Sequence, residues 1–262
     1  METIQHLTDY YSNYDEDGRL VSQNGSVEFL TTMRYIEKYL KSGDRILEIG
    51  AATGRYSHTL ARKGYAVDAI ELVDHNIEIF KQNTQEGESV TVTQGNAMDL
   101  YMLSDNIYDI TLLFGPMYHL YCKEDKQKAL SEAIRVTKQG GIIFVAYCIS
   151  DGAIIAYGFQ QGHIHDLLEK KMLDIIGFKA VSRPEDLFEL HRKEDIDDLM
   201  VDFPVKRLHY IATDGYTNNM REAINNLDSA AFEIYLQYHF FICEREDMTG
   251  LTQHALDIFR KD

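Results

Sequence analysis

Two acids and two glycines early in the chain have the spacing of a nucleotide-binding turn. Glu48 and Gly50 end one apolar run, Gly54 follows, and Glu71 ends the next apolar run. Glycines at these positions allow backbone angles and a close ligand approach that a Cβ atom would block. A carboxylate at the end of the second run can accept hydrogen bonds from both hydroxyls of a ribose. The spacing therefore predicts a nucleoside site in which Glu71 holds the ribose.

A strand, a turn, a helix and a second strand must position these residues. Residues 45–49 and 66–70 are nearly continuous apolar runs, which are typical of parallel strands buried on both faces. Residues 55–63 lie between them, have helical character and stop at Gly64. Free N–H groups at the start of that helix can face a carboxylate or a phosphate. Together these elements predict one half of a doubly wound α/β fold.

The first motif, Glu48-x-Gly50-x-x-x-Gly54, resembles that of class I S-adenosylmethionine-dependent methyltransferases. The dinucleotide fingerprint has a second glycine where this chain has Ala52, and that glycine lets the backbone approach a pyrophosphate. S-adenosylmethionine has no pyrophosphate, so Ala52 is compatible with it. The resemblance covers residues 27–150 well and the last strands loosely. It implies a mostly parallel, seven-stranded, Rossmann-like sheet that ends in an antiparallel pair, with S-adenosylmethionine as cofactor and S-adenosylhomocysteine as product.

The resemblance also implies which residues contact the cofactor. They are Tyr11, Arg19, Glu48, Gly50, Ala51, Gly54, Glu71, Leu72, Asn96, Ala97, Met98 and Phe114. Glu48 would organise the turn and reach the methionine ammonium, while the backbone of Ala51 follows the same tail. Residues 96–98 would hold the adenine, although Asn96 stands where the family has an acid. An amide oxygen can still accept a hydrogen bond from the adenine amine. Met98 as plain core filling is the alternative.

The N-terminal segment and one loop supply further candidates. Tyr11 and Arg19 would close over the cofactor, and Arg19 can grip a carboxylate; a solvated arm is the alternative. The loop of residues 115–120 follows the predicted fourth strand and carries the catalytic candidates. His119 is the first choice for a general base because imidazole titrates near neutrality, and Tyr118 is the second. A structural hydrogen bond is the alternative role for His119.

Four parts are expected along the chain. Residues 1–26 form a lid segment, 27–150 the cofactor-binding core, 151–204 a cap insertion, and 205–262 the final antiparallel strands with a helical insertion. An acidic helix is expected at residues 186–199 and a long helical stretch at 218–243. Both insertions are expected to reach the same end of the sheet and roof a small pocket.

Composition limits the possible partners. The net charge of −16 makes a nucleic-acid backbone an unfavourable partner. No run of apolar residues is long enough to span a membrane, and the polar, acidic N-terminus does not read as a signal peptide. Three distant cysteines indicate a reducing, cytoplasmic location. His163 and His165 would lie on different faces of a helix, so no metal site is expected.

The predicted reaction is in-line displacement of the sulfonium methyl group by an oxygen, nitrogen or carbon atom of a small-molecule acceptor. Two rival functions stay open. An NAD(P)-dependent oxidoreductase would use a similar sheet, and a non-catalytic S-adenosylmethionine-binding protein would keep the nucleotide half alone. A homodimer is possible, and the acceptor is not identified by the sequence.

Overall fold

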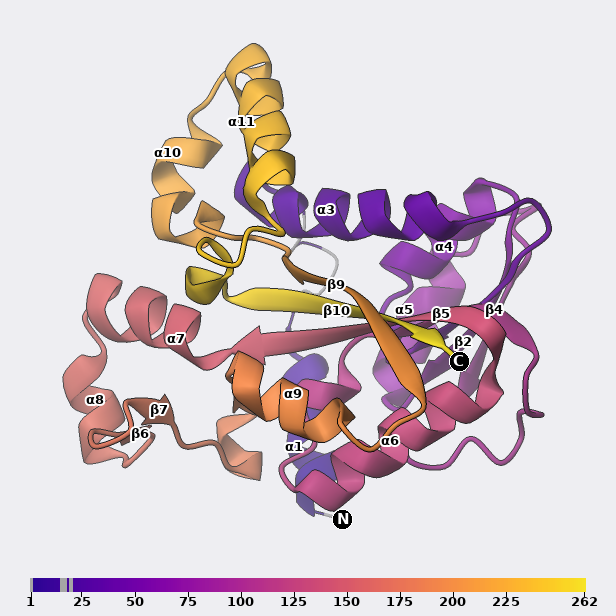
Figure 1. Ribbon diagram of the computed structural model, residues 1–262, viewed down its shortest axis with the longest axis horizontal. Coiled ribbons are helices and arrows are strands. Elements are labelled where there is room, and N and C mark those ends of the chain that lie inside the picture. Colours follow the sequence, from indigo (N-terminus) through magenta and orange to yellow (C-terminus); the bar gives the residue numbers. More distant parts are fainter. Residues whose placement is uncertain (1, 15–17, 19–20) are drawn as a thin grey trace.

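The structure is a computed structural model that describes residues 2–14, 18 and 21–262. The main sheet is twisted and has the strand order β3-β2-β1-β4-β5-β10-β9 (Figure 1). The strands are β1 (Arg45–Ile49), β2 (Ala66–Glu71), β3 (Val90–Gln94), β4 (Tyr108–Leu113), β5 (Thr137–Ile149), β9 (Val205–Ala212) and β10 (His254–Lys261). The first five are mutually parallel, and β10 pairs antiparallel with both β5 and β9. The doubly wound α/β prediction is confirmed.

Within the described residues the sheet has eight strands rather than the predicted seven. The extra strand is β8 (Leu190–His191), which pairs parallel with the end of β5. It lies where sequence analysis expected the acidic helix of residues 186–199. That helix, α9 (Lys193–Met200), begins later, because Asp195 accepts a hydrogen bond from the Arg192 backbone at 2.8 Å and caps it there.

Helices cover both faces of the sheet (Figure 1). On one face α3 (Gln23–Tyr39) and α4 (Arg55–Arg62) bury Ile36 and Leu60 against Ile46 of β1. On the other face α6 (Lys123–Val136) and α9 pack against a cluster that includes Leu47. Neighbouring β1 residues thus enter opposite cores, which explains the continuous apolar run. Helix α5 (Asp74–Asn83) buries Phe80 against Ala69 of β2.

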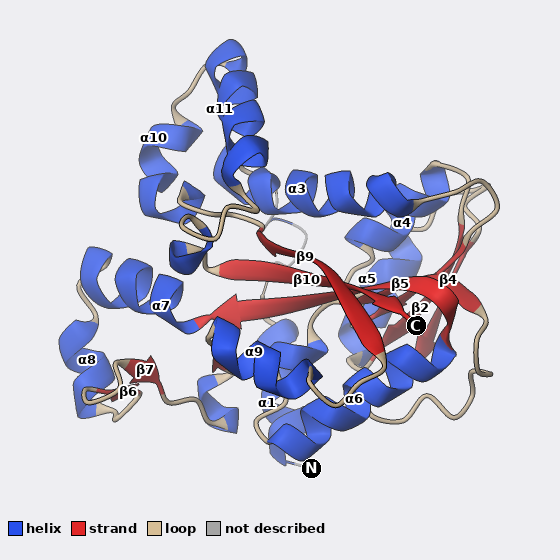
Figure 2. Cartoon of the chain, viewed as in Figure 1, coloured by secondary structure: helices blue, strands red, loops and turns tan. Residues whose placement is uncertain are grey.

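The insertions lie beyond the sheet as small helical bodies (Figure 2). The first contains α7 (Ser150–Ala153), a π-helical turn (Ile154–Gln160), α8 (Ile164–Glu169) and the hairpin β6–β7 (Leu173–Asp174, Lys179–Ala180). The second contains α10 (Arg221–Asn225) and α11 (Ser229–Ile242). The helical stretch expected at residues 218–243 is present but interrupted, because Asp228 accepts from the Ala231 N–H at 2.9 Å and starts a new helix. Across the described ranges, no helix is long and apolar enough to cross a membrane.

Candidate active site

A cavity of about 370 Å³ lies at the carboxyl ends of β1, β2, β3 and β4. Open α/β sheets bind their ligands at this edge. The cavity is lined by most of the predicted site residues: Tyr11, Glu48, Gly50, Ala51, Glu71, Leu72, Asn96, Ala97, Met98, Phe114, Tyr118 and His119. Gly54 lies outside the lining, and Arg19 lies outside the described residues. The fold therefore brings nearly all of the candidates into one place.

The glycine turn is built by close packing. Gly50 has φ +83°, and a Cβ atom there would lie 2.0 Å from the carbonyl oxygen of Phe114. Gly54 has φ +90°, and its Cβ would lie 2.5 Å from the ring of Phe80. Gly50 therefore lets the loop after β4 pass over β1, whereas Gly54 makes room for α5. The backbone N–H groups of Gly50 and Ala51 both donate to the carbonyl of Ile70, at 2.8 and 3.1 Å, and tie the turn to β2.

Glu48 joins this turn to the first helix. Its carboxyl group accepts hydrogen bonds from the backbone N–H of Ser57 at 2.9 Å and from the Ser57 hydroxyl. These donors belong to the first turn of α4, whose N–H groups have no partner inside the helix. Burial raises the pKa of Glu48 to about 8, although the bonds from Ser57 act in the opposite direction. Glu48 thus ties the end of β1 to the first turn of α4, and its predicted contact with a ligand ammonium stays a prediction.

Glu71 is held in a fixed orientation. Its Oε2 accepts from the backbone N–H of Ala52 at 2.7 Å, and its Oε1 accepts from the N–H of Val73 at 2.9 Å. Asn76 donates a longer bond of 3.4 Å to Oε1. Burial raises the pKa of Glu71, against the lowering effect of these donors. A carboxylate oxygen has two acceptor sites, so Oε2 keeps capacity for a ligand hydroxyl.

The turn after β3 forms an apolar slot. Its shape comes from Asn96, whose Oδ1 accepts from the Met98 N–H at 3.0 Å. Ala97 is buried, Met98 and Leu72 are half-buried, and all three line the cavity. The oxygen expected to accept from an adenine amine is therefore already used once within the turn. It can accept a second bond, so the predicted contact stays open.

His119 is held on both of its ring nitrogens. Nδ1 lies 2.9 Å from the carbonyl of Leu187, which can only accept, so Nδ1 carries the proton. Nε2 must then accept from the hydroxyl of Tyr11, at 2.9 Å. Burial lowers the pKa of His119 to about 4, which keeps the ring neutral. These contacts favour the alternative role for His119, a structural hydrogen-bonder that joins α1 (Glu2–Tyr11) to the loop after β4.

The roof of this cavity differs from the expectation. Its lining residues lie between Leu7 and Asp125, so neither insertion contributes to it. The first insertion reaches the site indirectly through Leu187 and Phe188, whose ring lies 5.4 Å from that of His119. The second insertion packs on α3 instead, where Asn225 bonds to Asn24. Helix α1 covers the cavity with Leu7 and Tyr11.

Arg55 was not among the predicted site residues. This residue begins α4 and lines the cavity, with its guanidinium 4.6 Å from the centre of the Phe29 ring. A signal was present in the sequence, because Arg55 directly follows the second glycine of the turn. A guanidinium at the start of a helix suits a carboxylate ligand.

Comparison with known proteins agrees with this geometry. Residues 47–145 match the family model of a methyltransferase domain. The chain is 30% identical over 135 residues to the demethylmenaquinone methyltransferase of Clavibacter sepedonicus, across 51% of this chain and 53% of that protein. It is 33% identical over 105 residues to the enzyme of the same name from Renibacterium salmoninarum, across 40% of this chain and 41% of that protein. The matched part therefore spans about half the length of these curated relatives, or less.

Among solved structures, the chain aligns with the geranyl diphosphate C-methyltransferase of Streptomyces coelicolor A3(2) at a TM-score of 0.63. The alignment covers 100% of this chain and 99% of that chain, at 11% identity, and so shows a shared fold. Within residues 47–145, the fold, the glycine turn and the family match are typical of a class I S-adenosylmethionine-dependent methyltransferase domain. That match covers less than half of the chain, and it favours the methyltransferase interpretation over the oxidoreductase alternative.

Proposed function

We propose that this protein transfers the methyl group of S-adenosylmethionine to a small-molecule acceptor. One observation carries the proposal: a single cavity brings together the glycine turn, the Glu71 carboxylate and the apolar slot of residues 96–98. Two of the similar proteins described above are named for demethylmenaquinone and one for geranyl diphosphate, which favours a small acceptor here too.

The residues present fit this cofactor. Oε2 of Glu71 has acceptor capacity for a ribose hydroxyl, and Leu72, Ala97 and Met98 give an apolar slot for adenine. Arg55, at the start of α4, suits the carboxylate of the methionine tail. The mixture of a few polar groups in a mostly apolar concave site is typical of small-ligand pockets.

The cofactor supplies a sulfonium methyl group, and the protein has to hold the two reactants in line and exclude water. The turn fixed by Gly50 and Glu71 would set the donor, and Phe114 and Tyr118 would set the side from which the acceptor approaches. Helix α1 closes the cavity through the Tyr11–His119 hydrogen bond. His119 acts in this account by holding α1 in place rather than by taking the acceptor's proton.

A labelling experiment tests the proposal. Purified protein is incubated with S-adenosylmethionine carrying a labelled methyl group and a cell extract, and the products are separated by ultrafiltration. Label in a small molecule of the filtrate other than S-adenosylmethionine and its breakdown products, formed only when the purified protein is added, is the expected result. Label in the protein or RNA fraction would contradict a small acceptor. Binding of S-adenosylhomocysteine without transfer to any fraction would favour the non-catalytic alternative.

A further inference from the structure

A second cavity, of about 40 Å³, continues the first along the same edge of the sheet. Tyr56, Phe114 and Tyr118 line both cavities and form the wall between them. The first cavity lies at the ends of β3, β2, β1 and β4. The second passes from the loop after β4 to Ala146 in β5, to the start of β10 and to Thr213 after β9. If the methyl donor occupies the first cavity, the second is the adjoining place for the acceptor's reacting group.

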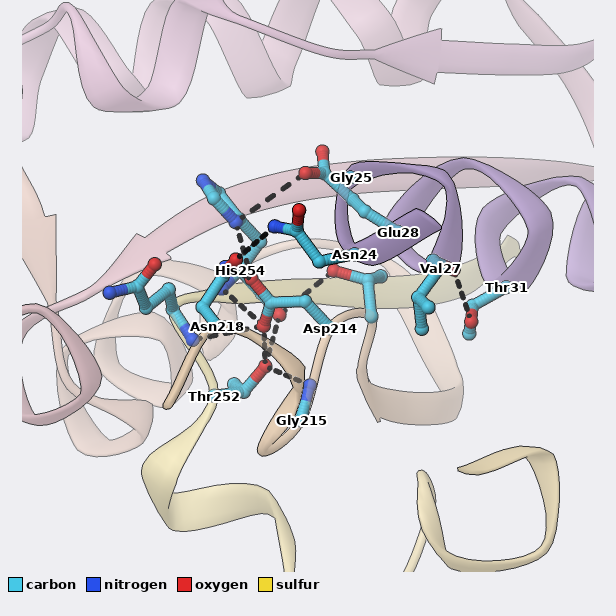
Figure 3. Close-up of polar contacts among 12 residues, drawn as sticks. Asn24, Gly25, Val27, Glu28, Thr31, Asp214, Gly215, Asn218, Thr252 and His254 are labelled. Carbon is cyan, nitrogen blue, oxygen red and sulfur yellow. Dashed lines mark hydrogen bonds and ion pairs between the residues drawn. The ribbon is translucent and has the colours of Figure 1, made fainter. Parts of the chain in front are cut away.

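A carboxylate and an imidazole line this second cavity, Glu28 from α3 and His254 from β10. Nδ1 of His254 lies 2.7 Å from Oδ2 of Asp214 and 3.5 Å from Oε2 of Glu28, so both carboxylates meet the same edge of the ring (Figure 3). The His254 side chain keeps 30% of its surface accessible, whereas Asp214 is buried beneath it. Asp214 thus fixes the ring, and Glu28 and His254 present a carboxylate and an imidazole side by side.

The charge of His254 follows from these neighbours. Burial alone would lower its pKa, but Glu28 and Asp214 outweigh that effect, with a smaller contribution from the Cys148 thiol, and raise the pKa well above its ordinary value. Burial would likewise raise the pKa of Asp214, but His254 and the surrounding donors lower it. The pair is therefore an imidazolium and a carboxylate at neutral pH.

A metal site explains the cluster of Glu28, Asp214 and His254 less well than hydrogen bonding does. Oδ1 of Asp214 accepts from the Thr252 hydroxyl and from the N–H groups of Gln253 and His254, and its Oδ2 accepts from Asn218 and His254. The carboxylate is thus saturated by hydrogen bonds. Nδ1 of His254 donates to it and therefore carries a proton, which a metal would have to displace.

Glu28 and His254 together determine which chemical group the second cavity can bind. An ammonium would be repelled by the His254 imidazolium and by the sulfonium of the donor. A carboxylate would be repelled by Glu28. A hydroxyl group can donate to Glu28 and accept from an imidazolium, and the volume of about 40 Å³ suits a small polar group. The aromatic wall of Tyr56, Phe114 and Tyr118 suits a ring attached to it.

Resting on the proposed methyl transfer, we infer that the second cavity holds the phenolic hydroxyl of an aromatic acceptor, with Glu28 as the general base. In the reaction a bond forms between the phenol oxygen and the methyl carbon while the sulfur–methyl bond breaks. The sulfur keeps the bonding electrons and leaves as the neutral thioether of S-adenosylhomocysteine. The phenol proton passes to the Glu28 carboxylate. Asp214 is a positioning residue that orients His254.

The test uses three probes that differ in one group, 4-ethylphenol, 4-ethylbenzylamine and 4-ethylbenzoate, with release of S-adenosylhomocysteine as the readout. We expect turnover of the phenol and a fall in its kcat/KM of about 100-fold in Glu28→Gln, as for loss of a general base. Glu37→Gln is the matched control: it lies on the same helix, is half exposed and pairs with Lys63. It should stay within about twofold of the unaltered protein.

Thermal stabilisation by S-adenosylhomocysteine is measured on every variant, which checks the fold and separates the two proposals. Preference for the amine or the benzoate, no turnover of the phenol, or an unaffected Glu28→Gln overturns the inference if S-adenosylhomocysteine still binds. If the unaltered protein does not bind S-adenosylhomocysteine, the proposed function itself fails. Because Glu28→Gln keeps the size of the side chain, lost activity with normal cofactor binding identifies the lost carboxylate.

Discussion

The edge of the sheet has two halves that are built in different ways. The cofactor half surrounds the first cavity, at the ends of β1 to β4, and the proposed acceptor half surrounds the second cavity, beside β5, β9 and β10. In the cofactor half, Glu71 bonds to Ala52, only 19 residues away, and one strand–turn–helix–strand unit sets the geometry. In the acceptor half, His254 meets Asp214 from 40 residues away and Glu28 from the opposite end of the chain. The first half is a local motif that can persist while its surroundings vary. The second half exists only when α3, β9 and β10 have packed together, so its specificity depends on tertiary structure.

The largest effect is expected where the local motif is packed most tightly. Gly50→Val should destabilise the fold by about 3 kcal/mol or more, because its side chain meets the Phe114 carbonyl and valine disfavours a positive φ. Thermal unfolding measures this.

Gly64→Ala is the control for that substitution. Gly64 has a similar φ of +91°, but a Cβ there would meet nothing within 4 Å. The substitution should lower the free energy of unfolding only through the unfavourable backbone angle, by about 1 kcal/mol. Equal losses in the two variants would show that crowding by the loop after β4 contributes nothing.

A second prediction concerns binding in the cofactor half. Glu71→Gln should weaken S-adenosylhomocysteine binding by about 10- to 100-fold, because bonds to a charged acceptor contribute about 1.5–3 kcal/mol. Asp74→Asn is the control: this exposed acid begins α5 close to Glu71 and does not line the cavity. Isothermal titration measures both. Unchanged affinity in Glu71→Gln would refute the ribose assignment.

The difference between the local cofactor half and the tertiary acceptor half also explains which features the sequence could predict. The order β1, turn, α4, β2 and the positions of Glu48 and Glu71 follow from apolar runs and glycine spacing, and the structure places them as expected. Strand β8 has only two residues and no periodicity to detect. The meeting of Glu28, Asp214 and His254 depends on how α3 lies across the sheet, which no local pattern encodes. Tyr11 and His119 are 108 residues apart in the sequence, and their hydrogen bond likewise forms only through tertiary packing.

A third prediction uses the buried His119. Its folded-state pKa of about 4 lies below the ordinary value of 6.5, so the unfolded chain binds more protons between these values. Stability should therefore be complete above about pH 6.5 and fall as the pH decreases toward 4, by about 2 kcal/mol at pH 5. Denaturant unfolding of the unaltered protein and of His119→Gln measures this. A pH dependence that is identical in both would show that His119 does not contribute.

The smallest effect is expected for Tyr11→Phe, which removes the hydroxyl that bonds to His119 and keeps the ring. Loss of one hydrogen bond should cost about 1 kcal/mol. In a double-mutant cycle with His119→Gln, the two changes should be less than additive, because they remove the same bond. Full additivity in thermal unfolding would contradict a direct link between α1 and the loop after β4.

Binding of the cofactor tests the central claim most directly. Thermal unfolding is compared with S-adenosylmethionine, S-adenosylhomocysteine and NADH. A ligand at about 100 times its dissociation constant stabilises by about 2.7 kcal/mol, which for this size raises the Tm by roughly 5–10 °C. We predict that shift with the two adenosyl-sulfur ligands, and a shift of at most about half that size for both in Glu71→Gln. A shift with NADH alone would contradict the account of the glycine turn and of every residue placed around it.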